Sequence, residues 1–268
     1  MAVNPIDRIA QTNLQLYRQL MDQHWSEEAL GLVADAYELA LGLFAVQVRP
    51  NRKSFVSHLV GTASAAATQS DRVEVTTASL LHAAYTLGDW GDGKHNRTLA
   101  RRVVVERAVG AAAEALVAKY TNMAWDHQTA AGYLARSAQM NEEERTLVLM
   151  RLANEVEEWN DLGLNFSVKG AYARFQLENV QAVEALARAL GHDPIADFIE
   201  RAFKDHASTS VPSCFRNEAS LPGRVTPQSP LLRFSVRLGS EIEKGKVVRR
   251  STRNVLNRLP LSRKALAS

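Results

Sequence analysis

Residues 55–82 read FVSHLVGTASAAATQSDRVEVTTASLLH, and this stretch decides the fold. Apolar and small residues recur there at helical spacing, and the positions are Phe55, Leu59, Ala63 and Ala66. Two histidines, His58 and His82, lie among small and apolar neighbours. The stretch therefore predicts two helices, each of which carries a histidine.

The helical period continues on both sides of this stretch, and no comparable period-two segment occurs. It is present at residues 30–44, 103–120, 147–159 and 175–190. Only one proline, Pro194, occurs between residues 54 and 205, so long helices are permitted. The helix boundaries are indicated by Ser26, by Asn141 with Glu144, and by Gly191. We expect about eight helices and an all-α fold.

The chain has 268 residues, which is long enough for a proper hydrophobic core. Its single cysteine, Cys214, excludes an intrachain disulfide and a zinc ribbon of cysteines. Residues 1–21 contain charges and lack a continuous apolar core, so they do not resemble a signal peptide. The most apolar stretch, residues 29–48, is interrupted by Asp35 and Glu38. We expect a cytoplasmic protein that is not anchored by a spanning helix.

The charge is divided unevenly along the chain. Residues 222–268 contain 11 Lys/Arg and 2 Asp/Glu, a net of +9, whereas the other 221 residues contain 21 and 27, a net of −6. We expect a helical domain over residues 1–207 with its core at about 53–161, a linker over 208–230, and a basic amphipathic tail over 231–268. The tail would meet an anionic membrane surface or a protein partner. Nucleic acid is less favoured, because Phe234 is the tail's only aromatic residue.

The motifs around the histidines resemble the HD superfamily of helical metal-dependent phosphohydrolases, most nearly its guanosine-tetraphosphate hydrolase branch. Phe55 to Val60 match the first motif, and Ala78 to His82 match the second. Arg107 to Gly110 and Arg151 to Asn154 resemble two later motifs. A poorly characterised bacterial subgroup is more similar still. Its pattern is matched by His58 to Thr62, Leu80 to His82, Tyr85 and the loop Gly88 to Gly93. The resemblance implies an HD-like bundle with extra N-terminal helices.

The chain departs from this pattern where the family has carboxylates. Ala83 replaces the Asp that follows the second His, and Asn154 replaces the distant Asp. The Glu-Asp pair of the hydrolase branch falls on Thr86 and Leu87. The resemblance therefore implies a divalent-metal site (Mn, Fe, Zn or Mg) that is degenerate.

A rebuilt metal site is one hypothesis. Its ligands would be His58, His82, Asn154 and His95, with Asp89 or Asp92 in place of a lost carboxylate and Arg102 beside a phosphate. The alternative is that both Asp residues form turns and that the histidines are satisfied core residues.

An acidic run follows Asn154 on the same predicted helix, and its members are Glu155, Glu157, Glu158 and Asp161. A solvent-exposed face is the expected interpretation of such a run. The alternative is that Asn154 points toward the histidines and that Glu158 supplies the lost carboxylate.

Two function classes remain open on the sequence. The chain is either a metal-dependent phosphohydrolase-like enzyme that acts on a small phosphorylated or nucleotide substrate, or a catalytically degenerate HD module that binds a ligand or a partner.

Overall fold

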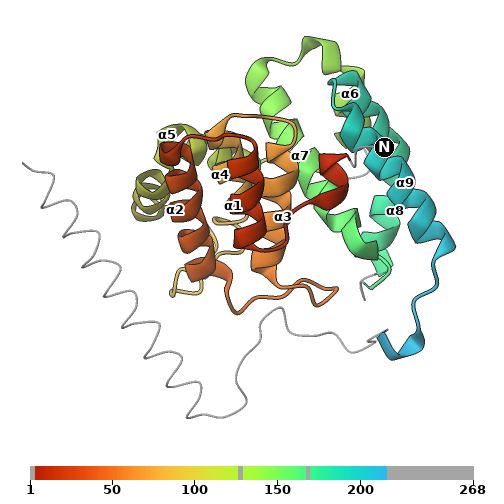
Figure 1. Ribbon diagram of the computed structural model, residues 1–268, viewed down its shortest axis with the longest axis horizontal. Coiled ribbons are helices and arrows are strands. Elements are labelled where there is room, and N and C mark those ends of the chain that lie inside the picture. The colour runs from red at the N-terminus through yellow and green to blue at the C-terminus, as the bar shows by residue number, and fades with distance from the viewer. Residues whose placement is uncertain (1–3, 126–128, 167–169, 216–268) are drawn as a thin grey trace, which may run out of the picture. The chain divides into compact units, whose positions relative to one another are not determined.

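The computed structural model describes residues 4–125, 129–166 and 170–215. The predicted basic tail and most of the predicted linker lie outside these ranges. The described residues form nine α-helices and no β-strand, which confirms the all-α fold class (Figure 1). The helices are α1 (Asn13–Asp22), α2 (Glu27–Phe44), α3 (Phe55–Ala67), α4 (Val73–Leu80), α5 (Leu99–Thr121), α6 (Thr129–Ala135), α7 (Glu142–Trp159), α8 (Gly170–Ala189) and α9 (Asp193–Ser208). Short 3-10 turns lie at Pro5–Arg8, Ser137–Gln139, Asn160–Leu162 and Ser213–Phe215.

The predicted helix boundaries are confirmed where capping residues define them. The Ser26 side chain accepts a hydrogen bond from the Ala29 amide at the start of α2. Asn141 and Glu144 form a reciprocal capping box at the start of α7. Gly191 has φ of 85°, the left-handed conformation typical of a helix end. One expectation was wrong, because α4 ends at Leu80 and His82 lies in the turns that follow it.

Helix α3 lies at the centre of the fold. It packs most extensively against α4 and α7, and it also contacts α1 and α2. Figure 1 shows α3 and α7 between α1 and α2 on one side and α8 and α9 on the other. Leu59, Val60 and Ala63 are fully buried in α3, and Leu152, Ala153 and Val156 are their buried counterparts in α7. Because α3 is buried on nearly all sides, a polar side chain on it needs a partner from a neighbouring helix.

Gly61 allows α3 to approach a side chain of α7 closely. A Cβ atom at this position would lie 2.5 Å from Glu157 Cγ and 2.9 Å from Gln11 Nε2. The Glu157 side chain cannot simply turn away, because its carboxylate is bound at its far end to His58 and Lys53. Glycine at position 61 therefore permits this arrangement around Glu157.

Substitution of Gly61 tests this packing. Gly61→Ala is expected to lower the free energy of unfolding by about 1–3 kcal/mol, because the new methyl group overpacks a filled space. Gly42→Ala is the matched control, since, apart from the adjoining residues and the backbone of α2 itself, no atom lies within 4 Å of a Cβ at that position. It is expected to raise stability by up to about 1 kcal/mol through helix propensity. Urea denaturation of both variants measures the difference, and equal effects would contradict the close approach.

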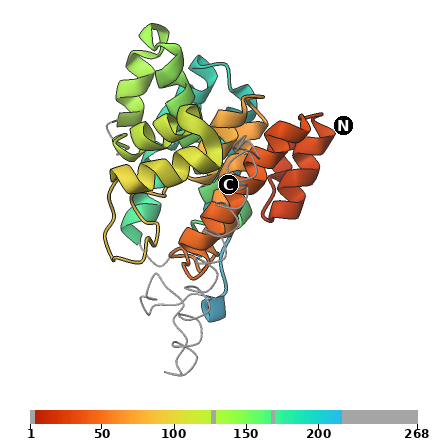
Figure 2. The same cartoon turned by 90° about the vertical axis from the view of Figure 1, so that its left-hand side faces the viewer.

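The loop between α4 and α5 is bound to α5 by polar contacts. Figure 2 shows this loop, which precedes α5 in the chain, extending beyond the helices. The Glu114 carboxylate is buried and accepts hydrogen bonds from Arg97 Nε (2.7 Å), Arg97 Nη2 (2.9 Å) and the Tyr85 hydroxyl (2.7 Å). The Trp90 ring stacks on Tyr85, and the Arg101 guanidinium lies over Trp90. These contacts give the loop a structural role.

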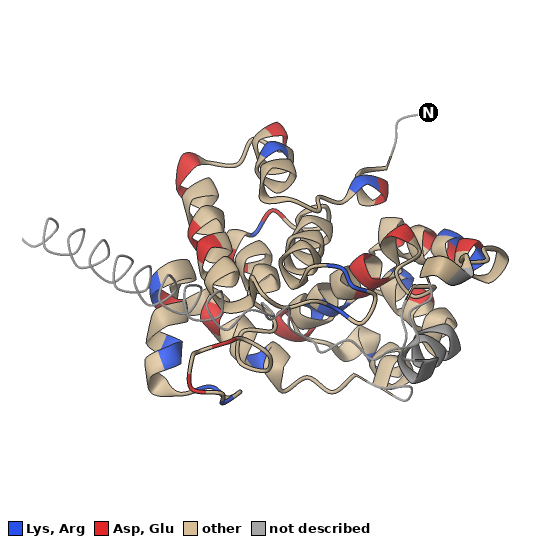
Figure 3. Cartoon of the chain, turned by 90° about the horizontal axis from the view of Figure 1, so that it is seen from below, with Lys and Arg blue, Asp and Glu red and all other residues tan. Residues whose placement is uncertain are grey.

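Charged residues of both signs lie close together on the helices of the described chain (Figure 3). Many form exposed ion pairs, such as Arg18 with Asp22 within α1 and Lys119 with Glu143 between α5 and α7. None of the helices in the described ranges combines the length and the apolar character needed to cross a membrane.

Candidate metal centre

His58 is completely buried at the middle of the fold. The Ser54 side chain caps α3 by accepting a hydrogen bond from the Ser57 amide, and this places His58 in the first turn, facing α7. Its Nδ1 atom is hydrogen-bonded to a Glu157 carboxylate oxygen. Because a carboxylate only accepts, Nδ1 carries the proton and Nε2 presents its lone pair.

His82 reaches the same point from the turns after α4. Its Nδ1–H donates to the Ser79 carbonyl oxygen at 2.8 Å, so its Nε2 also presents a lone pair. The rings of His58 and His82 lie 5.3 Å apart between centroids. The structure therefore brings together two imidazoles that the sequence separates by 24 positions.

Asn154 of α7 lies between the two imidazoles. Its side-chain nitrogen is 3.3 Å from His58 Nε2 and 3.2 Å from His82 Nε2. An amide NH₂ group has two hydrogens, so it satisfies both lone pairs at once. The hypothesis that Asn154 points toward the histidines is confirmed by these contacts.

Both histidines are neutral in the folded chain near neutral pH. Burial, followed by the nearby Arg49 charge, lowers the pKa of His58 to about 4. Burial, followed by the proximity of His58, holds the pKa of His82 well below its usual range. The hydrogen bonds from Asn154 match this neutral state, in which each Nε2 atom accepts.

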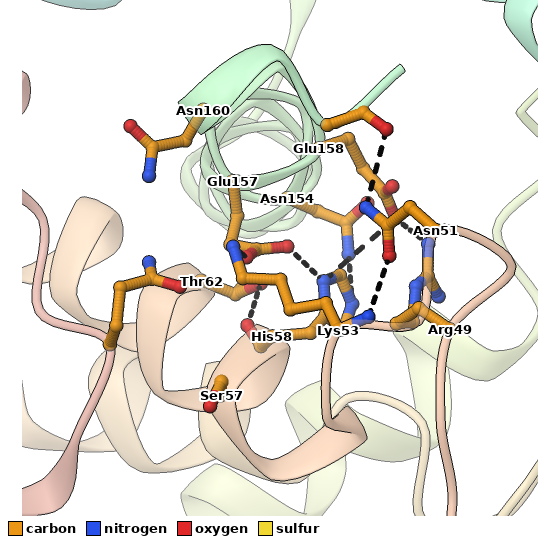
Figure 4. Close-up of polar contacts among 12 residues, drawn as sticks. Arg49, Asn51, Lys53, Ser57, His58, Thr62, Asn154, Glu157, Glu158 and Asn160 are labelled. Atoms are coloured by element: carbon orange, nitrogen blue, oxygen red, sulfur yellow. Dashed lines mark hydrogen bonds and ion pairs between the residues drawn. The ribbon is translucent and has the colours of Figure 1, made fainter. Parts of the chain in front are cut away.

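Two carboxylates of α7 lie on the opposite, Nδ1 side of His58 (Figure 4). Glu157 pairs with Lys53 as well as with His58, and Glu158 pairs with Arg49. Glu158 Oε1 lies 3.8 Å from His58 Nδ1. Burial alone would raise the pKa of Glu157, but His58 and Lys53 outweigh it and lower the pKa. Glu157 is thus held as a charged group, and Glu158 is paired with a cation from the same segment before α3.

The three glutamates of the acidic run, Glu155, Glu157 and Glu158, are buried, so the expectation of a solvent-exposed face was wrong for them. Asp161, which lies beyond the end of α7, is exposed as expected. Glu157 contacts His58 of α3, whereas Glu155 lies on another side of the helix. Glu155 accepts a hydrogen bond from Arg151 Nη2 at 2.8 Å. Arg151 Nη1 donates to the Tyr120 hydroxyl at 3.3 Å, and the Tyr120 ring lies 5.3 Å from that of His82. A ring contact therefore joins His82 to Tyr120 of α5, and hydrogen bonds continue from Tyr120 to Arg151 and Glu155.

The other sequence candidates lie in the loop before α5 or at its start. Asp89 and Asp92 accept hydrogen bonds from the amides of Gly91 and Lys94, as turn residues do. Asp92 also pairs with Arg101, and Arg102 pairs with Glu106. His95 is exposed. The structure brings His58, His82 and Asn154 together, and the carboxylates that it places beside His58 come from α7.

The metal site implied by the resemblance does not fit the residues present. At the point where the two Nε2 atoms meet, the donors are two neutral imidazoles and a neutral amide, and Ala83 supplies none. The site implied by the resemblance holds its ion with carboxylate oxygens in addition to imidazole nitrogens, and hard divalent ions prefer such oxygens. A different group, His58 with Glu157 and Glu158, could hold a metal ion, since its ligand atoms lie within 4.8 Å of one another. Among the described residues, the predicted ligands Asp89, Asp92 and His95 do not belong to this group.

Lys53, Arg49 and the pairing of Glu157 with His58 were missed by sequence reasoning. The one available signal was spacing, because Glu157 follows Asn154 by three positions and shares its helix face. Nothing in the local pattern near residues 49–53 indicated that their cations reach α7.

The described residues define an all-helical fold with a buried His/Glu/Glu group whose ligand atoms are close enough together to hold a metal ion. The family described as "Domain of unknown function (DUF6817)" matches residues 42–124 of this chain. The match covers His58, His82 and the loop before α5, and it ends before α7 with Asn154, Glu157 and Glu158. No curated protein matches the chain.

Proposed function

We propose that this chain is a catalytically degenerate HD-related module that serves as a binding protein for a ligand or a partner. The observation that carries the proposal is the position of Asn154. Its amide donates to both imidazole Nε2 atoms at the point where the resemblance places a hydrolytic metal ion. Asn154 and Ala83 stand where the resemblance implies the two carboxylates of that ion, and neither residue supplies one.

A second candidate function is a metal-dependent phosphohydrolase acting on a small phosphorylated or nucleotide substrate. The observation that favours it is the buried group of His58, Glu157 and Glu158, which could hold an ion on the other side of the same imidazole. Arg49 and Lys53 lie beside these carboxylates and would supply positive charge for a phosphate.

Phosphate release separates the two functions. The full chain is incubated with Mn²⁺ and either a general phosphomonoester or guanosine nucleotides. We expect no more phosphate than His58→Gln releases under the same conditions. Repeated turnover by the wild-type chain that His58→Gln abolishes would overturn the proposal and establish the hydrolase.

Restoring a carboxylate tests the interpretation of Asn154. Asn154→Asp is expected to lower stability by about 1–3 kcal/mol without metal, because a buried carboxylate would then face two lone pairs. Mn²⁺ is expected to restore stability, and this effect should need His82. The measurement is the Mn²⁺-induced shift in Tm of Asn154→Asp with and without His82→Gln, and Asn122→Asp is an exposed control. Equal shifts with and without His82→Gln would contradict the interpretation.

The basic tail provides the module with a surface for association. A net of +9 over residues 222–268 supports association with an anionic membrane surface or an acidic protein face in the cytoplasm. Co-sedimentation of the chain with anionic liposomes, with and without residues 222–268, tests the membrane alternative, and equal pelleting of both would remove it.

A further inference from the structure

Three buried side chains surround one point on the Nδ1 side of His58. Glu157 and Glu158 come from consecutive positions of α7, and Figure 4 shows both beside the imidazole. Their oxygens and His58 Nδ1 lie within 4.8 Å of one another, and Glu158 Oε1 is 3.8 Å from Nδ1. A divalent ion with ligand distances of about 2.0–2.2 Å needs only small side-chain shifts to bind all three.

The charges of this group match a divalent ion. The two carboxylates together carry −2, and the Lys53 ammonium and the Arg49 guanidinium balance them with +2. A divalent ion also carries +2, so it could replace the two cations without changing the net charge of the buried group. The attraction of the two carboxylates then offsets the cost of removing the ion from water, and no uncompensated charge is left in the protein interior.

Lys53 and Arg49 are able to leave. Their side chains are 20% and 17% exposed, whereas those of Glu157 and Glu158 are 2% and 6% exposed. Both cations belong to a short turn before α3, in which the Arg49 amide donates to the Lys53 carbonyl oxygen at 2.8 Å. Long side chains at the edge of the site can move their charged ends into water, while the carboxylates stay in place.

We propose that one divalent transition-metal ion, Zn²⁺ or Mn²⁺, binds to His58 Nδ1 and to one oxygen each of Glu157 and Glu158, displacing Lys53 and Arg49. One imidazole nitrogen with two carboxylate oxygens suits these ions, and water would complete the coordination. This inference rests on the proposed function in one respect: the metal ion would be a ligand of the proposed binding protein.

Ion binding changes the protonation of His58 without a net loss of protons. The proton on Nδ1 moves to Nε2, because Nδ1 must present its lone pair to the ion. Asn154 then turns its amide oxygen toward Nε2–H, at the expense of its hydrogen bond to His82. This site is distinct from the one implied by the resemblance, which uses the Nε2 side and requires His82.

Calorimetric titration of the untagged full chain with Zn²⁺ tests the proposal. We expect one ion per wild-type chain, loss of this binding in Glu157→Gln and in Glu158→Gln, and its retention in His82→Gln. Lys53→Met is expected to bind Zn²⁺ about tenfold more tightly, because it removes a competing cation. Lys119→Met, which removes an exposed cation paired with Glu143, is the matched control and should leave the affinity unchanged.

The expected gain in Lys53→Met keeps the test informative even if a glutamine variant fails to fold. The proposal is overturned if neither wild type nor Lys53→Met binds Zn²⁺, or if binding is lost in His82→Gln and retained in Glu157→Gln. The proposed function is tested separately, because it would fail if the chain released phosphate with repeated turnover. The Zn²⁺ titration does not measure phosphate release.

Discussion

Lowering the pH from 7 to 4.5 is expected to destabilise the folded chain by about 2 kcal/mol through His58 alone. The pKa of His58 in the folded chain is about 4, against an ordinary value of 6.5, because the ring is buried and lies near Arg49. Between these two values the unfolded chain binds a proton that the folded chain does not. Protonation therefore favours unfolding, and stability falls as the pH falls through this window.

Two other groups act in the same direction. The lowered pKa of His82 adds to the loss over the same window. The lowered pKa of Glu157 contributes stability that is present above its ordinary value of 4.5 and is lost as the pH falls further. The pH dependence should therefore begin near pH 6.5 with the histidines and continue below pH 4.5 with the carboxylate.

Urea denaturation at pH 7 and at pH 4.5 measures this effect. His58→Gln should be less stable than wild type at pH 7 but should lose about 2 kcal/mol less on acidification. His95→Gln, at an exposed loop position, should keep the wild-type slope. If His58→Gln and wild type lose stability in parallel, the buried neutral imidazole is not the cause.

Glu157→Ala is expected to lower the free energy of unfolding by about 3–5 kcal/mol. The substitution leaves His58 Nδ1–H without its acceptor and the Lys53 ammonium without its counter-ion at a largely buried position. The larger part of the cost comes from the completely buried His58 Nδ1–H, which has no access to water, and from the space that the side chain leaves. The Lys53 ammonium adds a smaller part, because its side chain is 20% exposed and can turn toward water.

Two further variants separate the effect of unpaired buried groups from the simple loss of a negative charge. Glu143→Ala removes a carboxylate from the same helix, but the pair that it forms with Lys119 is about half exposed, so a loss of no more than about 1 kcal/mol is expected. Adding Lys53→Met to Glu157→Ala should recover part of the stability, because it removes the unpaired cation. Absence of any recovery would assign the loss to packing instead.

The histidines and the carboxylates of α7 form one connected group with two sides. On the Nε2 side, Asn154 provides neutral hydrogen bonds, and on the Nδ1 side the two glutamates provide negative charge. The degenerate-module proposal concerns the first side, and the Zn²⁺ titration concerns the second. Because His58 belongs to both sides, its substitution affects both of them. Substitution of His82 tests the Nε2 side alone, and substitution of Glu157 tests the Nδ1 side alone.

Much of the fold could be predicted from local pattern. The 3.6-residue period of apolar positions and the capping residues Ser26 and Asn141 predicted helices that the structure contains. His58 and Asn154 were candidate site residues because they matched motifs in a fixed order, and the structure places them in contact. The helices depend on residues that are close together in the chain, and the candidate site residues depend on the order of the motifs. A sequence shows local spacing and motif order directly.

What only the tertiary structure decided is the environment of the charged residues. The acids at positions 155, 157 and 158 of α7 have the same local pattern whether they face water or the core, and the spacing alone favoured water. Glu157 is buried because its partners His58 and Lys53 lie 99 and 104 positions away and meet it only when α3 packs on α7. Gly61 permits that approach, since any side chain there would occupy the space of Glu157. The sequence by itself predicted an all-α fold with two histidines among small and apolar residues. The packing of α3 on α7 decided which carboxylates lie beside His58, because the burial of a charge depends on partners distant in the chain.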